Sequence, residues 1–266
     1  MEAPARRVLN TAPVTLENAP ATHRRLLADV LDLGHDHGLA LGGGYAVLAH
    51  GLVALPQALG CARARGRDLD FVTERPVSAA EIVGHLTAGL RARGWLVGET
   101  DVSPLMARMT VADPDTEEMC EVVVAKEVLW RPPVVLEGVG PVLAVEDLAG
   151  TKVRALVDRG LPRDMVDVYA AGGRFSTAEL EHLGARHDED FDLRELRDRL
   201  EGLEWVSDGE FQAYGLAGDQ VRDLRGWAGA WAQDIAERLA EPYEEPDEEP
   251  DEDAYEEPGA QPGGDG

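Results

Sequence analysis

Two aspartates stand one residue apart in the stretch GRDLDFVT, and this spacing is the first feature of the sequence that could carry chemistry. Successive side chains of a β-strand alternate faces, so Asp68 and Asp70 point to one side and Leu69 and Phe71 to the other. Like charges held this close repel, and each raises the pKa of the other unless a cation lies between them. The pair is therefore either a site for a hard cation such as Mg²⁺ or a strand end that faces water.

A glycine-rich turn precedes the two aspartates, in LALGGGYAVLAHG. A strand expected at residues 39–41 leads through the glycines into an expected helix, whose first N–H groups lack partners and can bind an anion. The spacing matches neither the dinucleotide fingerprint GxGxxG nor a P-loop. The turn is either a phosphate site or a tight left-handed turn without a ligand.

Together these two patches resemble the signature of polymerase-beta-like nucleotidyltransferases, in which a glycine-rich turn precedes an Asp-x-Asp strand. Here the strand follows Gly44 by 24 residues. More narrowly, the chain resembles AbiEii/AbiGii-type nucleotidyltransferase toxins, whose lysine-bearing helix and following Arg-Asp…Asp helix are matched by EDLAGTKVRALVDRGLPRDMVDVY. The resemblance covers roughly residues 39–169. It implies a Mg²⁺-dependent transfer of a nucleotide from an NTP to an RNA (for example tRNA) or protein acceptor, and an antitoxin protein as partner.

The resemblance also implies roles for particular residues. The metal ligands would be Asp68, Asp70 and Glu121, and Lys152 would join them in catalysis. The nucleotide would be bound by Gly43, Gly44, Tyr45, Arg67, Arg163, Asp164 and Asp167. Tyr45 departs from the pattern, because many nucleotidyltransferases place Ser or Thr there. The connection from the turn to the strand is also longer than expected.

Three of these assignments have a plain alternative. Glu121 opens the apolar stretch MCEVVVA, and a lone Glu at a strand start often lies on the surface. Lys152 either supplies a point charge for phosphate or lies on a solvated helix face. The basic loop that contains Arg63, Arg65 and Arg67 either lines the triphosphate approach or is simply solvated.

Two rival functions stay open at this point. A small-molecule nucleotidyltransferase would modify an aminoglycoside-type substrate and would have a closed acidic pocket. A catalytically silent relative would act as an interaction module through its acidic tail and would bind no nucleotide.

The charge of the chain is strongly acidic and unevenly spread. The 266 residues include 51 Asp and Glu against 25 Lys and Arg. Residues 241–266 hold 12 of the acidic residues and no basic residue, so we expect a disordered acidic tail there. The rest of the chain still has an excess of acidic residues, which argues against sequence-blind nucleic-acid binding over a broad surface. A local basic pocket remains compatible with this charge.

The order of the expected elements predicts an α+β fold: a nucleotidyltransferase-like mixed sheet with flanking helices, followed by a helical C-terminal domain. The expected organisation is a flexible leader at 1–16, a core at 17–144, the helical domain at 145–240 and the tail. The chain shows neither a signal peptide nor an apolar run of about 20 residues, so no membrane association is expected. Two widely spaced cysteines fit a reducing cytoplasm.

Overall fold

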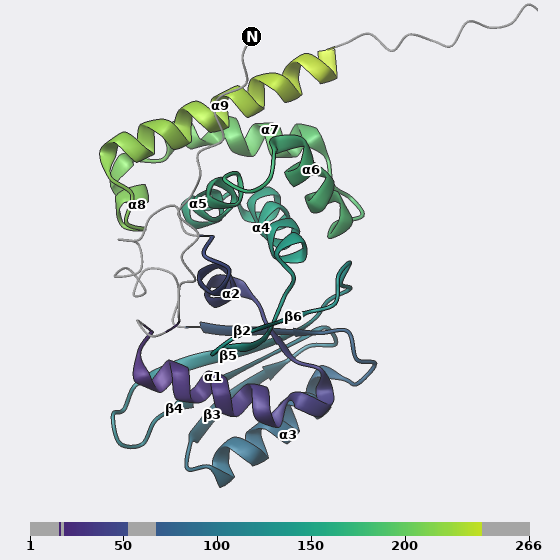
Figure 1. Ribbon diagram of the computed structural model, residues 1–266, viewed down its shortest axis with the longest axis vertical. Helices are drawn as coiled ribbons and strands as arrows, with labels where there is room; N and C mark the ends of the chain where they lie inside the picture. The colour runs from purple at the N-terminus through teal and green to yellow at the C-terminus, as the bar shows by residue number, and fades with distance from the viewer. Residues whose placement is uncertain (1–15, 17–18, 53–67, 241–266) are drawn as a thin grey trace, which may run out of the picture.

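The computed structural model describes residue 16 and residues 19–52 and 68–240 (Figure 1). Most of the expected leader, the basic loop with Arg67 and the expected acidic tail lie outside the described residues. The described part is a mixed α/β structure with a C-terminal helical region, as the sequence predicted.

A seven-stranded mixed sheet forms the first half of the described chain, in the strand order β3-β4-β5-β2-β1-β7-β6. The strands are β1 (Ala40–Leu41), β2 (Asp68–Thr73), β3 (Leu96–Val102), β4 (Met106–Ala112), β5 (Met119–Lys126), β6 (Val134–Leu136) and β7 (Gly140–Val142). The central strand β2 runs parallel to β5 and antiparallel to β1, and β1 runs parallel to β7. The outer pairs β3–β4, β4–β5 and β6–β7 are antiparallel.

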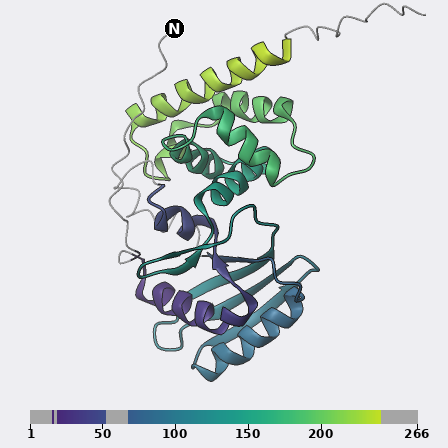
Figure 2. The same ribbon diagram turned by 45° about the vertical axis from the view of Figure 1, so that its right-hand side comes forward.

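Helices cover both faces of this sheet (Figures 1 and 2). Those of the first half are α1 (Ala21–Leu33), the short 3₁₀ helix η2 (His35–His37), α2 (Gly43–Ala49) and α3 (Ala79–Ala92). Those of the second half are α4 (Val145–Arg159), α5 (Pro162–Ala171), α6 (Thr177–Arg186), α7 (Leu193–Glu201), η4 (Gly202–Trp205), α8 (Asp208–Gln212) and α9 (Gly218–Ala240). In both views α1 and α3 lie below the sheet, whereas α2 and the C-terminal helices lie above it.

The alternation of β2 decides which of its side chains face which layer. Leu69 and Phe71 are fully buried and belong to the hydrophobic core that includes the apolar faces of α1 and α3. Asp68 and Asp70 therefore face the opposite layer, towards α2 and α4. The apolar spacing of α1 and α3 places one stripe of each helix against the sheet, which is why these helices form there.

Serine side chains cap the first turn of two helices. Ser78 caps α3 by accepting a hydrogen bond from the N–H of Glu81 at 3.2 Å. Ser176 caps α6 through a full capping box with Glu179. A second hydrophobic cluster fills the space among α4 to α9, and its residues begin within α4 at Ala149. A domain boundary at residue 145 stays a prediction.

Two strands were not predicted from the sequence. β6 and β7 lie in the stretch RPPVVLEGVGPVLAV, where prolines remove backbone donors and each strand has only three residues. Their pairing also depends on β1, far away in the chain, which β7 joins in parallel at Leu41 and Val142. None of the helices in the described part of the chain combines the length and the apolar character that a membrane span requires.

Candidate active site

Three acidic positions meet on one face of the central strands. Asp68 and Asp70 lie on β2, and the register of β2 with β5 places Asp68 directly beside Glu121. Neighbouring residues in register share a face, so all three side chains project from the same side of the sheet. Arg108 on β4 faces the same side, because β4 pairs it with Val123, which in turn lies beside Asp70. Its Nη1 atom is 3.5 Å from Oε2 of Glu121.

The glycine turn is pressed against Asp70. The N–H of Gly42 donates to the carbonyl oxygen of Asp70 at 2.8 Å, which ties the turn to β2. Gly43 has φ +57°, in the left-handed region that side chains rarely adopt. A Cβ at this position would overlap Oδ2 of Asp70 and lie 2.6 Å from its Cγ and 2.7 Å from its Cβ. Only glycine therefore allows this close approach of backbone and carboxylate.

Two ion pairs fix the helices that face the aspartates. Nζ of Lys152 on α4 lies 2.9 Å from Oδ2 of Asp167 on α5, and both side chains are largely buried, at 15% and 13% exposure. Arg159, in the last turn of α4, donates to both carboxylate oxygens of Asp164, at 2.6 and 3.2 Å. Because Asp164 is buried in the first turn of α5, this fork holds the end of one helix against the start of the next.

A cavity of about 350 Å³ lies between the sheet and these helices. Its volume falls in the range of roughly 300–1,000 Å³ that small-molecule sites usually have. The residues of the sequence-based assignment that line it are Gly43, Gly44, Asp68, Asp70, Lys152, Arg163, Asp164 and Asp167. Residues from the glycine turn, the Asp-x-Asp strand and both matched helices thus share one cavity, although they are far apart in the sequence.

The other three assigned residues are placed differently. Glu121 stands beside Asp68 on the sheet but is not among the residues that line the cavity, and it is paired with Arg108. The Tyr45 side chain is buried in the core, where its hydroxyl lies 2.5 Å from Nδ1 of His23. Only the backbone of Tyr45 can contribute to an anion site. Arg67 lies outside the described residues.

The two aspartates are held in conditions that disfavour their charged forms. Burial raises the pKa of Asp70 above its ordinary value, and the opposing attraction of Lys152 and Arg163 does not cancel this effect. Burial raises the pKa of Asp68 as well, and the neighbouring charge of Asp70 adds to the shift. Paired carboxylates with raised pKa values gain most from a cation placed between them.

The donor set fits a magnesium ion that shares its coordination with a substrate. Mg²⁺ keeps several waters and is usually bound by one or two carboxylates together with substrate phosphates. Asp68 and Asp70 supply two carboxylates at the cavity wall. Within the described part of the chain, no three His, Cys, Asp or Glu side chains are grouped so that they could hold a metal ion. The three-carboxylate set with Glu121 is therefore not assembled as a cage in this structure.

Several residues at the cavity were not identified from the sequence, and three of them show why. Arg108 lies on the polar face of β4, and only the strand register brings it near the aspartates. Arg159 follows Lys152 by seven residues, two helical turns along α4, which is a signal that the sequence did contain. Tyr214 follows α8 and reaches the cavity through the packing of the C-terminal helices, so no local pattern announces it.

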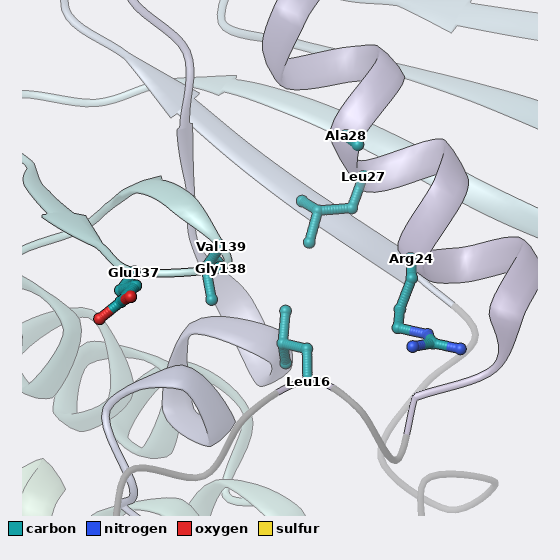
Figure 3. A pocket seen from close by; sticks show the side chains of 7 residues that line it. All are labelled: Leu16, Arg24, Leu27, Ala28, Glu137, Gly138 and Val139. Carbon is teal, nitrogen blue, oxygen red and sulfur yellow. The ribbon is translucent and has the colours of Figure 1, made fainter.

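A second, smaller cavity of about 190 Å³ lies between α1 and the turn that joins β6 to β7. Figure 3 shows Leu16 and Leu27 on opposite sides of this space, and the Arg24 and Glu137 side chains extend away from each other. One acidic and one basic side chain at its rim cannot perform the paired-carboxylate chemistry of the larger cavity. The larger cavity is therefore the candidate active site.

The comparisons with known proteins give the following. No protein-family model matches the sequence, and no curated protein sequence matches it. The chain is similar in structure to JHP933 from Helicobacter pylori, with a TM-score of 0.46 and 19% identity, over 82% of this chain and 92% of that chain. It is also similar to MenT4 from Mycobacterium tuberculosis H37Rv, described as a nucleotidyltransferase toxin, with a TM-score of 0.46 and 17% identity over 83% of this chain and 95% of that chain.

Proposed function

We propose that this protein is a Mg²⁺-dependent nucleotidyltransferase that moves a nucleotide from an NTP to a hydroxyl group of an RNA or protein acceptor. The observation that carries the proposal is the pairing of Asp68 and Asp70 across one cavity from Lys152, with the glycine turn packed on Asp70. These are the parts that phosphoryl-type transfer requires, because such transfer depends on positioning and charge neutralisation.

The residues have separable roles in this reaction. Asp68 and Asp70 would hold the Mg²⁺ ion, which when bound supplies charge neutralisation of the triphosphate. Lys152, Arg159 and Arg163 face the cavity from the helices and provide positive charge for phosphate oxygens from the other side. The first N–H groups of α2, at Gly43 and Gly44, lie at the cavity wall and are able to donate to the same oxygens.

The transfer balances without a covalent enzyme intermediate. The acceptor oxygen forms a bond to the α-phosphorus, and the bond from that phosphorus to the bridging oxygen breaks. Pyrophosphate leaves with the electron pair, and the hydroxyl proton passes to a carboxylate at the site.

Incubation with each NTP labelled at the α-phosphate tests this function. Mg²⁺ and either total cellular RNA or total cellular protein would be present. We expect label on a macromolecule with the wild type and with the matched surface variant Asp36→Asn, and none with Asp70→Asn. Thermal melts would show that all three proteins are folded. Absence of transfer and of binding for every NTP would instead identify a catalytically silent relative.

We propose in addition that the reaction harms the cell that contains the protein, as the resemblance to AbiEii/AbiGii-type toxins implies. An antitoxin protein would then be its partner. Induced expression tests this directly: the wild type should arrest growth, and Asp70→Asn at the same protein level should not. Equal growth of both cultures would remove the toxin role and leave nucleotidyl transfer intact.

A further inference from the structure

A cluster of one tryptophan and two arginines lies next to the candidate active site and has no role in the account above. The guanidinium carbon of Arg131 is 4.3 Å from the centre of the Trp130 ring, and that of Arg186 on α6 is 4.1 Å from it. Trp130 remains 39% exposed. We call these three residues the Trp130 platform.

Two carboxylates, one fully buried and one exposed, hold the backbone of the platform. Both oxygens of Asp147, which is fully buried, accept from the platform's backbone: one from the N–H of Trp130 at 2.6 Å, the other from that of Arg131 at 2.9 Å. The preceding N–H, of Leu129, donates to Glu74 at 2.8 Å. Three consecutive N–H groups are thus fixed, so the platform is formed before any ligand arrives.

Asp147 stays ionised in this position. Burial alone would raise the pKa of Asp147, but hydrogen bonds from His187, Trp130 and Arg131 together lower it below its usual value. Nε2 of His187 is 3.2 Å from the Asp147 carboxylate. The Asp147 carboxylate therefore accepts hydrogen bonds from backbone N–H groups and from an imidazole. It does not neutralise the guanidinium groups of the platform.

The charge of the platform contrasts with that of the cavity. In the cavity Lys152, Arg154 and Arg159 each have a carboxylate partner within 2.9 Å. Among the described residues, neither Arg131 nor Arg186 has a carboxylate within ion-pair distance. Two unneutralised guanidinium groups on an acidic protein favour a polyanion and repel a cationic small molecule.

The platform continues from the wall of the cavity. Glu127 lines the cavity and precedes Trp130 by three residues, so their Cα atoms are at most about 11 Å apart. On α4, Asp147 precedes Thr151, which also lines the cavity, by four residues, a rise of about 6 Å along the helix. A polyanionic chain whose end reacts in the cavity can therefore extend over the platform.

We propose that the Trp130 platform binds the acceptor, and that this acceptor is RNA whose single-stranded end passes over Trp130 into the cavity. Arginine guanidinium groups bind phosphates and stack on bases, and the Trp130 ring holds two of them in place by contact with both. This inference rests on the proposed function and specifies its acceptor class. A protein acceptor is the competing outcome.

Fluorescence anisotropy with a labelled single-stranded RNA of 12 nucleotides, measured across a salt series, tests the platform. The test variant is Arg131→Gln with Arg186→Gln, which keeps side-chain size and removes two charges. The matched control is Arg24→Gln with Arg222→Gln, which makes the same change of charge on α1 and α9. A third variant, Trp130→Phe, retains an aromatic ring and both arginines. It shows whether a change within the platform that keeps its charge also keeps RNA binding.

We expect the test variant to bind RNA at least tenfold more weakly at low salt. Each phosphate contact on a single strand contributes about 0.7 to the slope of log K against log salt, so two lost contacts should reduce the slope by about 1.4. The control and Trp130→Phe should bind nearly as the wild type does. Equal affinity and equal slope for the test variant and the wild type would overturn the inference.

NTP binding, measured by calorimetry on the same proteins, separates this inference from the proposed function. If the test variant binds NTP normally but has lost RNA binding, both proposals stand. If transfer assays label protein and not RNA, the platform inference fails while nucleotidyl transfer survives. If the wild type binds no NTP, the proposed function itself fails.

Discussion

Replacement of Gly43 by alanine is the sharpest probe of the geometry that the site depends on. Two costs can be read from the structure. The first is backbone strain: Gly43 has φ +57°, and a left-handed conformation costs an L-residue about 1–2 kcal/mol. The second is overlap with Asp70, because the new Cβ would lie 2.7 Å from the Cβ of that residue.

Rotation of the Asp70 side chain cannot relieve this overlap. It moves the carboxylate, but the Asp70 Cβ is fixed to β2, so α2 and β2 must separate by about 1 Å to reach ordinary carbon–carbon contact. The strain alone should lower the melting temperature of Gly43→Ala by about 2–8 °C. The separation should in addition remove Mg²⁺-dependent NTP binding, because both walls of the cavity move.

Gly138→Ala is the matched control. Gly138 has φ +74°, and a Cβ there would meet no heavy atom within 4 Å. It therefore carries the strain without the overlap, and should melt at a lower temperature but bind NTP as the wild type does. Thermal melts and calorimetry of both variants measure the two effects separately. Wild-type NTP affinity in a folded Gly43→Ala protein would refute the argument that the turn must lie on Asp70.

The remaining predictions concern charge. Because the folded pKa of Asp70 is raised, the wild type loses stability as pH rises through that value, so Asp70→Asn should melt higher at pH 7, with a difference that vanishes near pH 4 in melts across the pH range. Asp164→Ala should cost about 1–3 kcal/mol in denaturant unfolding, since it removes the two hydrogen bonds that the half-exposed Arg159 donates to a buried carboxylate; a loss below about 0.5 kcal/mol would contradict that role. Lys152→Met alone and Asp167→Asn alone should each lower the melting temperature more than the double variant does, because each single change removes the ion-pair partner of a largely buried charge. Double-mutant analysis would show this as a coupling between the two residues.

Much of the fold could be predicted because its signals are local. The alternation in β2 assigned Asp68 and Asp70 to one face, and a serine directly before a helix, as at Ser78 and Ser176, is a signal of the same local kind. Strands β6 and β7 were missed because their pairing comes from β1, a partner far away in the chain, and prolines obscure the pattern. Long-range pairing of three-residue strands leaves almost no local trace.

The grouping of assigned residues around one cavity could be predicted where a motif carries its own spacing. The period of a strand places Asp68 and Asp70 on one face of β2, and the period of a helix places Lys152 on one face of α4. These side chains share the cavity because α4 packs over that face of the sheet. Arg108 was missed because only the register of β4 with β5 brings it to the aspartates. The burial of the Tyr45 side chain against His23 could not be predicted, because the two residues are 22 positions apart and no local pattern indicates their contact.

Calorimetric titration of the wild type with each NTP, first with Mg²⁺ and then with a chelator, tests the central claim most directly. Asp70→Asn would be titrated in parallel, with Asp36→Asn as the matched control. The account predicts that at least one NTP binds with Mg²⁺, and that both the chelator and Asp70→Asn abolish this binding while Asp36→Asn does not. Equal NTP affinity with and without the chelator, or in Asp70→Asn, would contradict the assignment of Asp68 and Asp70 as the metal-binding pair.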